Sequence, residues 1–130
     1  MPSVVVLLGE GPAATYEYTA PLLGTYRKST EMFNSKPVYQ LDGRNFYLFY
    51  DTVGYWRIDN DVNDHESRYY HIRSKKLNLL SPPSNEWQYC TIDQCETASS
   101  DWRDDEHLLL LESGNKVSCP RFGTRSGKAC

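Results

Sequence analysis

The sequence predicts an all-β, mostly antiparallel fold: a small sandwich or barrel-like domain with a central three-stranded meander. Aromatic residues make up 13% of the chain and ten residues are tyrosines, whose rings pack on half-buried sheets while the hydroxyl stays in water. Short apolar or alternating segments are separated by turn residues, as in β domains. At 130 residues we expect a single domain, 1–130, with a core module at about 15–112 and a Cys-bracketed tail at 113–130.

The first hairpin of the meander is the clearest local signal. Residues 37–41 read as a strand that begins with proline, where the missing N–H matters least. Asp42 and Gly43 then form a tight-turn pair, because glycine tolerates the positive φ that such turns require. Residues 45–50 return as a strand that is apolar on both faces, which predicts a mid-sheet position with cover on each side.

The third strand of the meander is expected at residues 55–58, after a turn. Trp56 and Ile58 fall on one face and Tyr55 and Arg57 on the other, because side chains alternate along a strand. Three strands joined by two short turns make the predicted meander.

The flanking segments predict further strands. Alternation of aromatic and polar residues indicates a strand at 15–19, and the leucine-rich segment 107–112 suits either a buried strand or a short helix, with the following turn favouring a strand. The remaining expected strands lie at 4–8, 25–27, 69–72, 77–80 and 86–92.

The charge balance and the hydropathy pattern exclude several classes of function. Against 14 Lys and Arg stand 17 Asp and Glu, a net charge of -3, so no basic excess is present to bind nucleic acid. No apolar run approaches the ~18 residues of a membrane span. The apolar cluster at 4–8 is shorter than a signal-peptide core and no Lys or Arg precedes it. Either a signal has been removed, or the chain is intracellular.

The four cysteines favour an oxidising compartment. Local pairing, Cys90 with Cys95 and Cys119 with Cys130, is the preferred interpretation, and free buried thiols in a cytosolic protein are the alternative. Neither pair has the two-residue spacing usual for zinc ligands. We therefore expect the extracellular space or the secretory pathway, although no signal peptide is visible in this chain.

Roughly residues 22–112 resemble a small aromatic β-module that recurs in large, mostly uncharacterised extracellular multidomain proteins of invertebrates and protists. The resemblance implies a β fold and an adhesive or matrix setting, and it implies no catalytic residues. The residues that carry it are Gly24-Thr25-Tyr26, Pro37-Val38-Tyr39, Tyr47-Leu48-Phe49-Tyr50, Tyr55-Trp56-Arg57-Ile58, Trp87 and a strand over 105–110.

A run of acidic and amide residues after the meander resembles the first half of a calcium loop. Asp59, Asp61 and Asn63 offer oxygen ligands at alternating positions. The sixth and twelfth positions of an EF-hand loop, which require Gly and Glu, hold Asp64 and Tyr70 instead. A solvated acidic turn is the favoured interpretation, and a looser calcium site stays open.

No catalytic constellation is evident in the sequence. The sequence contains three histidines, His65, His71 and His107, and histidine is the residue type most often used in acid–base chemistry and metal binding. A metal-dependent hydrolase could be assembled from His65, His107 and nearby carboxylates, although no spacing requires it. A serine-nucleophile elbow and a phosphate-binding glycine loop are both missing from the sequence. We predict no enzyme, no cofactor and no metal ligand.

Aromatic side chains near turns are the remaining site candidates. Trp102, beside Arg103 in a polar stretch, is the best candidate for a surface anchor, and Tyr55 and Trp87 are further candidates. For Trp87 a core position is the favoured interpretation. The favoured function is a non-catalytic interaction module for a protein or carbohydrate partner. The alternatives are a structural subunit docked permanently in a larger assembly and, third, the metal-dependent hydrolase.

Overall fold

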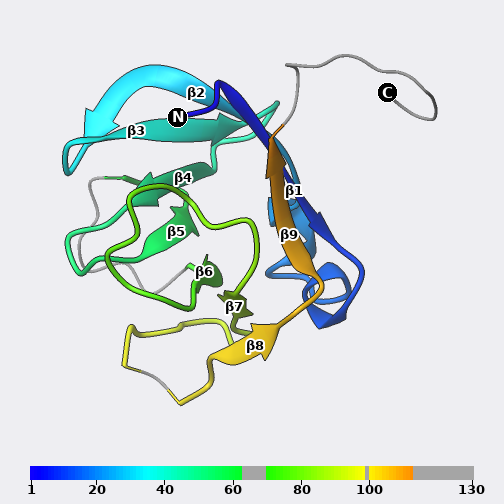
Figure 1. Ribbon diagram of the computed structural model, residues 1–130. Coiled ribbons are helices and arrows are strands. Elements are labelled where there is room, and N and C mark those ends of the chain that lie inside the picture. Colours follow the sequence, from blue (N-terminus) through cyan, green and yellow to red (C-terminus); the bar gives the residue numbers. More distant parts are fainter. Residues whose placement is uncertain (63–69, 99, 113–130) are drawn as a thin grey trace.

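The fold is known from a computed structural model that describes residues 1–62, 70–98 and 100–112. This part of the chain forms nine strands and two short 3₁₀ turns, labelled in Figure 1 where there is room. The elements are β1 (Val4–Gly9), η1 (Pro12–Ala14), η2 (Ala20–Leu22), β2 (Gly24–Phe33), β3 (Lys36–Leu41), β4 (Tyr47–Tyr50), β5 (Trp56–Asp59), β6 (Ile72–Ser74), β7 (Trp87–Tyr89), β8 (Arg103–Asp105) and β9 (Leu108–Glu112).

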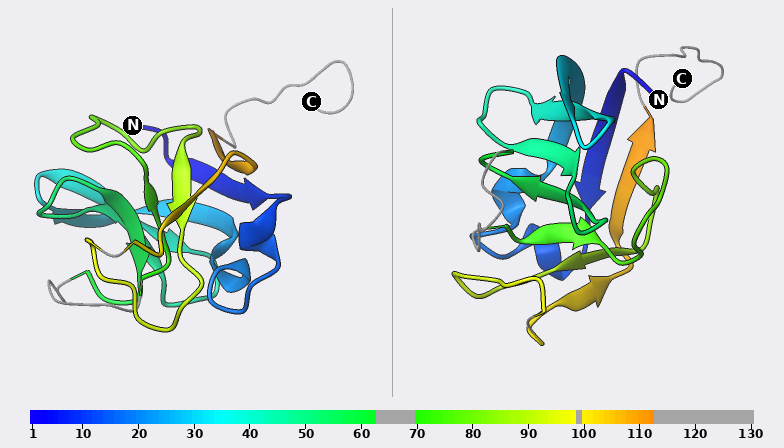
Figure 2. Two further views of the ribbon diagram at one scale, coloured as in Figure 1. Left: turned by 90° about the horizontal axis from the view of Figure 1, so that it is seen from below. Right: turned by 90° about the vertical axis from the view of Figure 1, so that its left-hand side faces the viewer.

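All of these strands belong to one antiparallel sheet with the order β8-β7-β6-β5-β4-β3-β2-β1-β9. The two outermost strands, β8 and β9, are consecutive in the chain and only Glu106 and His107 separate them. Leu110 of β9 also donates its N–H to the carbonyl of Ser84, in the loop before β7, at 2.9 Å. The sheet therefore curls into a nearly closed barrel (Figure 2), which confirms the predicted all-β, barrel-like fold.

The predicted meander is confirmed as β3, β4 and β5, and its turns have identifiable causes. Gly43 has a φ of 75° in the first turn, a conformation that glycine adopts without strain. In the second turn, the Oδ1 atom of Asp51 accepts the N–H groups of Val53, Gly54 and Tyr55 at 3.0, 2.8 and 2.8 Å. A single carboxylate thus satisfies the backbone donors of the turn and fixes the register of β5 against β4.

Aromatic rings fill much of the barrel interior, and the polar ends of these rings are satisfied. Trp56 and Trp87 are both buried, and their indole N–H groups donate to the carbonyls of Leu79 and Pro83 at 3.0 and 3.1 Å. The hydroxyl of Tyr26 donates to the carbonyl of Leu22 at 2.6 Å. Because each buried donor has an acceptor, the rings contribute their hydrophobic burial without the cost of an unpaired polar group. Trp56 and Ile58 share the inward face, as predicted.

The strand expected at 15–19 is wrong. This segment turns between η1 and η2, and the N–H groups of Thr19 and Ala20 both donate to the carbonyl of Tyr16. The Thr19 hydroxyl is bonded to the carbonyl of Ala13. Because these bonds satisfy the backbone locally, the segment has no need of a strand partner. The alternating tyrosines instead stack on other elements, as described below.

The strand expected at 77–80 is also wrong, and one strand in a polar stretch was missed. Asn78 has a φ of 62°, and its N–H donates to the carbonyl of Gly54 at 2.8 Å, which holds this segment in a loop. The missed strand, β8, carries Asp105 on its inward side. This buried carboxylate accepts the Ala13 N–H at 3.1 Å and the His107 N–H at 2.9 Å, so its burial is compensated.

Within the described residues, no helix combines the length and the apolar character that crossing a membrane requires.

Candidate functional site

Two of the predicted site residues lie in the interior. This corrects the expectation of an exposed ring for Trp102, whereas for Trp87 it agrees with the favoured core position. Trp87 is a member of the main core. Trp102 is only 8% exposed and packs with Tyr70 and the Cys90–Cys95 pair in a second apolar cluster. Its indole N–H donates to the carbonyl of Glu96 at 2.9 Å. The polar residues on either side of Trp102 in the sequence gave no indication of this burial.

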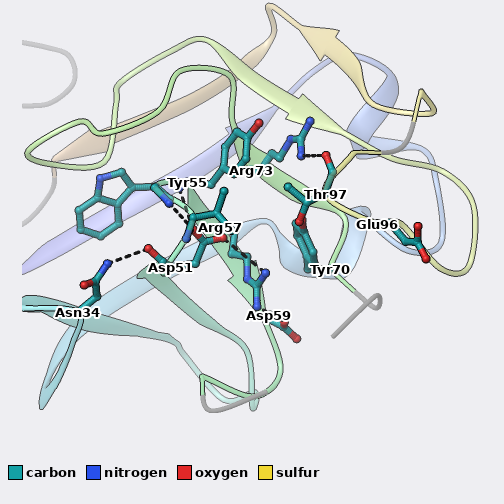
Figure 3. Close-up of polar contacts among 12 residues, drawn as sticks. Asn34, Asp51, Tyr55, Arg57, Asp59, Tyr70, Arg73, Glu96 and Thr97 are labelled. Atoms are coloured by element: carbon teal, nitrogen blue, oxygen red, sulfur yellow. Dashed lines mark hydrogen bonds and ion pairs between the residues drawn. The ribbon is translucent and has the colours of Figure 1, made fainter. Parts of the chain in front are cut away.

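Trp102 and Tyr55 are brought together around an arginine of the protein itself. The Cζ atom of Arg73 lies 4.1 Å from the Trp102 ring centroid and 4.3 Å from that of Tyr55. Arg73 also donates through Nε to Gln88 at 3.0 Å. Its Nη1 donates to the carbonyl of Thr97 at 2.7 Å (Figure 3). These two predicted site residues therefore bind an internal cation.

Arg103, the fourth predicted site residue, is exposed. Its Nη1 donates to the carbonyl of Ser100 at 2.9 Å, within the same connection of the chain. Of the four predicted site residues, only Arg103 has a largely solvent-exposed side chain. The two tryptophans are buried, and Tyr55 is half-buried with its ring against Arg73.

A second buried arginine occupies the neighbouring strand. The guanidinium of Arg57 lies between the rings of Phe49 and Tyr70, with its Cζ 5.3 and 4.3 Å from their centroids. Its Nη1 lies 3.5 Å from Asp51 and its Nη2 lies 3.3 Å from Asp59 (Figure 3). Two aromatic rings and two carboxylates thus form an internal guanidinium site.

One of the candidate calcium ligands has another role in the fold. Asp59 is buried against Arg57 and also accepts the N–H of Asn60 at 2.7 Å. Asn63 lies outside the described residues. No cluster of three or more His, Cys, Asp or Glu side chains suited to a metal occurs in the described part of the chain.

The residues of the hydrolase hypothesis are not assembled in the described structure. His107 is exposed and lies 3.7 Å from the carboxylate of its neighbour Glu106. His65 lies outside the described residues. His71 is buried, and both contacts of its Nε2 are backbone carbonyls, those of Ile92 at 2.8 Å and Asp93 at 3.1 Å. Since carbonyls only accept, this nitrogen carries a proton and donates.

Residues 90–98 form a loop over the outer side of β5 and β6, called the cover loop below. The Cys90–Cys95 disulfide, with an S–S distance of 2.09 Å, closes its first part and confirms that predicted pair. The predicted pairing of Cys119 with Cys130 lies outside the described residues. Thr97 anchors the second part of the loop, because its carbonyl accepts from Arg73 and its hydroxyl lies 2.7 Å from that of Tyr70.

The cover loop delivers Asp93 to a pocket at one end of the barrel. This end pocket has a volume of about 270 Å³. Core side chains contribute the apolar part of the pocket. Its aromatic rings come from the turn segment before β2 and from the β3–β4 connection. Its acidic residues come from the same turn segment and from the cover loop. Its lining residues are Glu17, Tyr18, Pro21, Leu22, Phe46, Ile58, His71 and Asp93.

Tyr18 is held in the end pocket by a ring stack. Its ring centroid lies 4.9 Å from that of His71, with 11° between the planes. The Asp93 carboxylate, followed by burial and by Glu17, raises the pKa of the Tyr18 hydroxyl above its ordinary value. The Tyr18 hydroxyl therefore lies in a negative local potential.

A second pocket of about 350 Å³, beside β7 and β8, has several of its charges internally paired. Lys75 donates to Asp104 at 2.8 Å, and this bond, followed by one from Gln88, lowers the pKa of Asp104. Glu86 pairs with Lys76 at 3.1 Å. The buried carboxylate of Asp105 accepts backbone N–H groups, as described above. Most of the charged side chains that line this pocket are therefore bonded to other groups of the protein.

The outer face of β1 and β9 carries a patch that sequence reasoning missed. Val6 pairs with Leu111 and Leu8 pairs with Leu109 across the two strands. Leu8, Leu109 and Leu111 are 46%, 38% and 44% exposed, whereas the alternate residues of both strands point into the core. We call these residues, Val6, Leu8, Leu109 and Leu111, the aliphatic strip. The only sequence signal for it was the lack of polar alternation within 4–8 and 108–111.

No protein-family model, curated protein or solved structure matches this chain.

Proposed function

We propose that this protein is a non-catalytic interaction module that binds a partner protein through the aliphatic strip. The observation that carries the proposal is the exposure of large apolar side chains on adjacent strands of a well-packed sheet. In an antiparallel sheet with one solvated face, outward residues are normally polar. An exposed contiguous apolar patch on a soluble protein commonly marks an interaction surface.

The chemistry of the strip favours a protein over a glycan as its partner. Its residues are aliphatic, so they offer neither aromatic faces for sugar stacking nor groups that bond to hydroxyls. Cross-strand partners lie side by side, so the four side chains form one continuous surface. Such a surface suits the desolvated centre of an interface whose polar rim lies around it.

The non-catalytic part of the proposal is supported by the use of the titratable groups. Among the described residues, the buried acids and His71 bond to backbone groups or to arginines within the fold.

The extracellular or secretory setting is supported by the Cys90–Cys95 disulfide, because such bonds persist mainly in oxidising compartments. A structural subunit is the alternative, in which the same strip is covered permanently.

The test compares the strip with a matched pair of leucines elsewhere. Leu8→Gln combined with Leu109→Gln changes the strip, and Leu77→Gln combined with Leu80→Gln changes two exposed leucines of a loop. Native mass spectrometry of each full-length protein, purified gently from its source, would follow any stoichiometric partner. We expect wild type and the loop variant to retain the same partner and the strip variant to lose it, with unchanged melting temperatures.

Two outcomes would contradict the proposal. Retention of the same partner by the strip variant would show that binding occurs elsewhere. A concentration-dependent dimer in sedimentation velocity that the strip variant abolishes would identify a second copy of this chain as the occupant. A partner that dissociates on dilution supports an interaction module, and one that never dissociates under native conditions favours the structural subunit.

A further inference from the structure

We infer that the end pocket binds an organic cation of side-chain size, such as the alkylammonium group of a lysine. This site is separate from the aliphatic strip and does not depend on the function proposed for it. The pocket combines an apolar floor, aromatic rings and two carboxylates within about 270 Å³. This volume lies just below the about 300–1,000 Å³ of pockets for drug-sized molecules, so the pocket has room for a ligand the size of one side chain.

The carboxylates that line the end pocket, those of Glu17 and Asp93, have no compensating partner among the described residues. Neither Glu17 nor Asp93 forms a hydrogen bond or an ion pair through its carboxylate with another described residue. None of the described residues that line the pocket is Lys or Arg. In the pocket beside β7, by contrast, Lys75 already pairs with Asp104 at 2.8 Å. The carboxylates of the end pocket therefore retain an attraction for an added cation.

The protein itself shows that this set of groups holds a cation. Arg57 lies between two aromatic rings, with its Cζ 5.3 and 4.3 Å from their centroids, and beside two carboxylates at 3.5 and 3.3 Å. The end pocket presents the same classes of group, two rings and two carboxylates, in Tyr18, Phe46, Glu17 and Asp93. What differs is that no arginine of the described chain enters it.

The site is held in place before any ligand arrives. His71 stacks on Tyr18 and donates to the carbonyls of Ile92 and Asp93, so one side chain orients both the ring and the acidic loop. The Cys90–Cys95 disulfide restrains the same short loop. Preorganisation of this kind lowers the entropic cost of binding. The raised pKa of Tyr18, caused first by Asp93, is consistent with a negative potential at the pocket.

The experiment is an NMR titration of the ¹⁵N-labelled full-length chain with N-acetyl-lysine N-methylamide. N-acetyl-norleucine N-methylamide is the matched probe, because it keeps the aliphatic chain and lacks the ammonium. We expect the lysine probe to shift the amide resonances of Tyr18, His71 and Asp93, and the norleucine probe to leave them in place. Added salt should weaken the lysine interaction, since screening reduces exposed charge attraction.

Glu17→Gln combined with Asp93→Asn should raise the Kd for the lysine probe on the order of tenfold, as loss of two exposed charge interactions predicts. Glu10→Gln combined with Glu31→Gln removes the same charge at exposed positions outside the lining of the pocket and should leave the Kd unchanged. The strip variant, Leu8→Gln with Leu109→Gln, should bind the lysine probe like wild type. Its result separates this inference from the function proposed above.

Three results would overturn the inference. Equal shifts from the norleucine probe would mean that the pocket recognises only an apolar chain. Binding of methyl β-glucoside at these residues, without binding of the lysine probe, would identify a glycan subsite. An unchanged Kd in the Glu17 and Asp93 variant would show that the carboxylates take no part.

Discussion

Arg57 of β5 and Arg73 of β6 are direct cross-strand partners on the outer side of the barrel. Like charges directly opposite each other normally destabilise an antiparallel pair. Here each guanidinium lies between two aromatic rings, and the two stacks meet where Tyr70 contacts Trp102 at 5.3 Å between centroids. Two carboxylates balance Arg57, whereas Arg73 donates to neutral acceptors. Through the bond from Arg73 to the Thr97 carbonyl, this pair of stacks connects the cover loop to the sheet.

Replacing Arg73 should therefore cost more stability than replacing an exposed arginine. Arg73→Ala removes a stack between Tyr55 and Trp102 and two hydrogen bonds, so we expect a loss of about 2–4 kcal/mol in the free energy of unfolding. Urea unfolding measures it. Arg27→Ala is the control, because its ion pair with Asp42 is exposed and should contribute about 1 kcal/mol or less. Equal losses in the two variants would show that the stack is energetically unimportant.

Asp51 should be the most sensitive acid of the meander. Asp51→Ala removes the acceptor of three backbone N–H groups and one partner of Arg57, which predicts a loss of about 3–5 kcal/mol. Asp51→Asn keeps an oxygen for the turn and removes the charge, so its loss should be smaller. Chemical denaturation of both variants, with Asp42→Ala as an exposed control, tests this order. If Asn and Ala cost the same, the backbone bonds of the turn contribute little.

The meander was predictable because its signals are local. Gly43 provides the positive φ of one turn and Asp51 caps the other, and both properties belong to the residue type. The opposite faces of Trp56 and Arg57 follow from simple alternation. Local chemistry of this kind is visible in a single sequence.

The candidate sites were not predictable because their partners are distant in sequence. Trp102 was expected at the surface, yet its ring packs on Arg73, which only the fold brings near. Tyr18 was expected in a strand, but its ring meets His71 and Asp93 at the end of the barrel. Alternation predicts which side chains share a face, and it does not predict which segments meet.

Tyr26 should make stability fall in alkaline solution. Burial raises the pKa of its hydroxyl far above the ordinary 10.0, so the folded state keeps a proton that the unfolded state loses. This contribution is fully present below pH 10 and is lost as pH rises toward the folded-state pKa, at about 1.4 kcal/mol per pH unit. Burial also raises the pKa values of Tyr39 and Tyr89, which act in the same direction.

The Tyr26→Phe variant isolates this effect. It should lose about 1 kcal/mol at pH 7, because the hydrogen bond to the Leu22 carbonyl disappears. Above pH 10 the free energy of unfolding of this variant should fall less steeply with pH than that of wild type. The two slopes should differ by the contribution of one titrating proton, about 1.4 kcal/mol per pH unit. Urea unfolding between pH 7 and 11.5 provides the comparison, with Tyr47→Phe as the control for removal of a half-buried hydroxyl. An identical alkaline slope in Tyr26→Phe and wild type would assign the decline to other groups.

The Cys90–Cys95 disulfide should matter more for the end pocket than for the barrel. Its loop is short, with a sequence separation of 5, so Cys90→Ala combined with Cys95→Ala should cost only about 2 kcal/mol by loop-closure entropy. Hydrogen exchange should accelerate in the cover loop and stay unchanged in β3 to β5. Because Asp93 lies within the closed loop, the same variant should bind the lysine probe more weakly.

His71→Phe should also weaken this binding. It keeps a ring against Tyr18 but removes the donor to the carbonyls of Ile92 and Asp93. Unchanged affinity in both variants would mean that Asp93 is positioned without the disulfide or His71, and preorganisation of the pocket would then have another source.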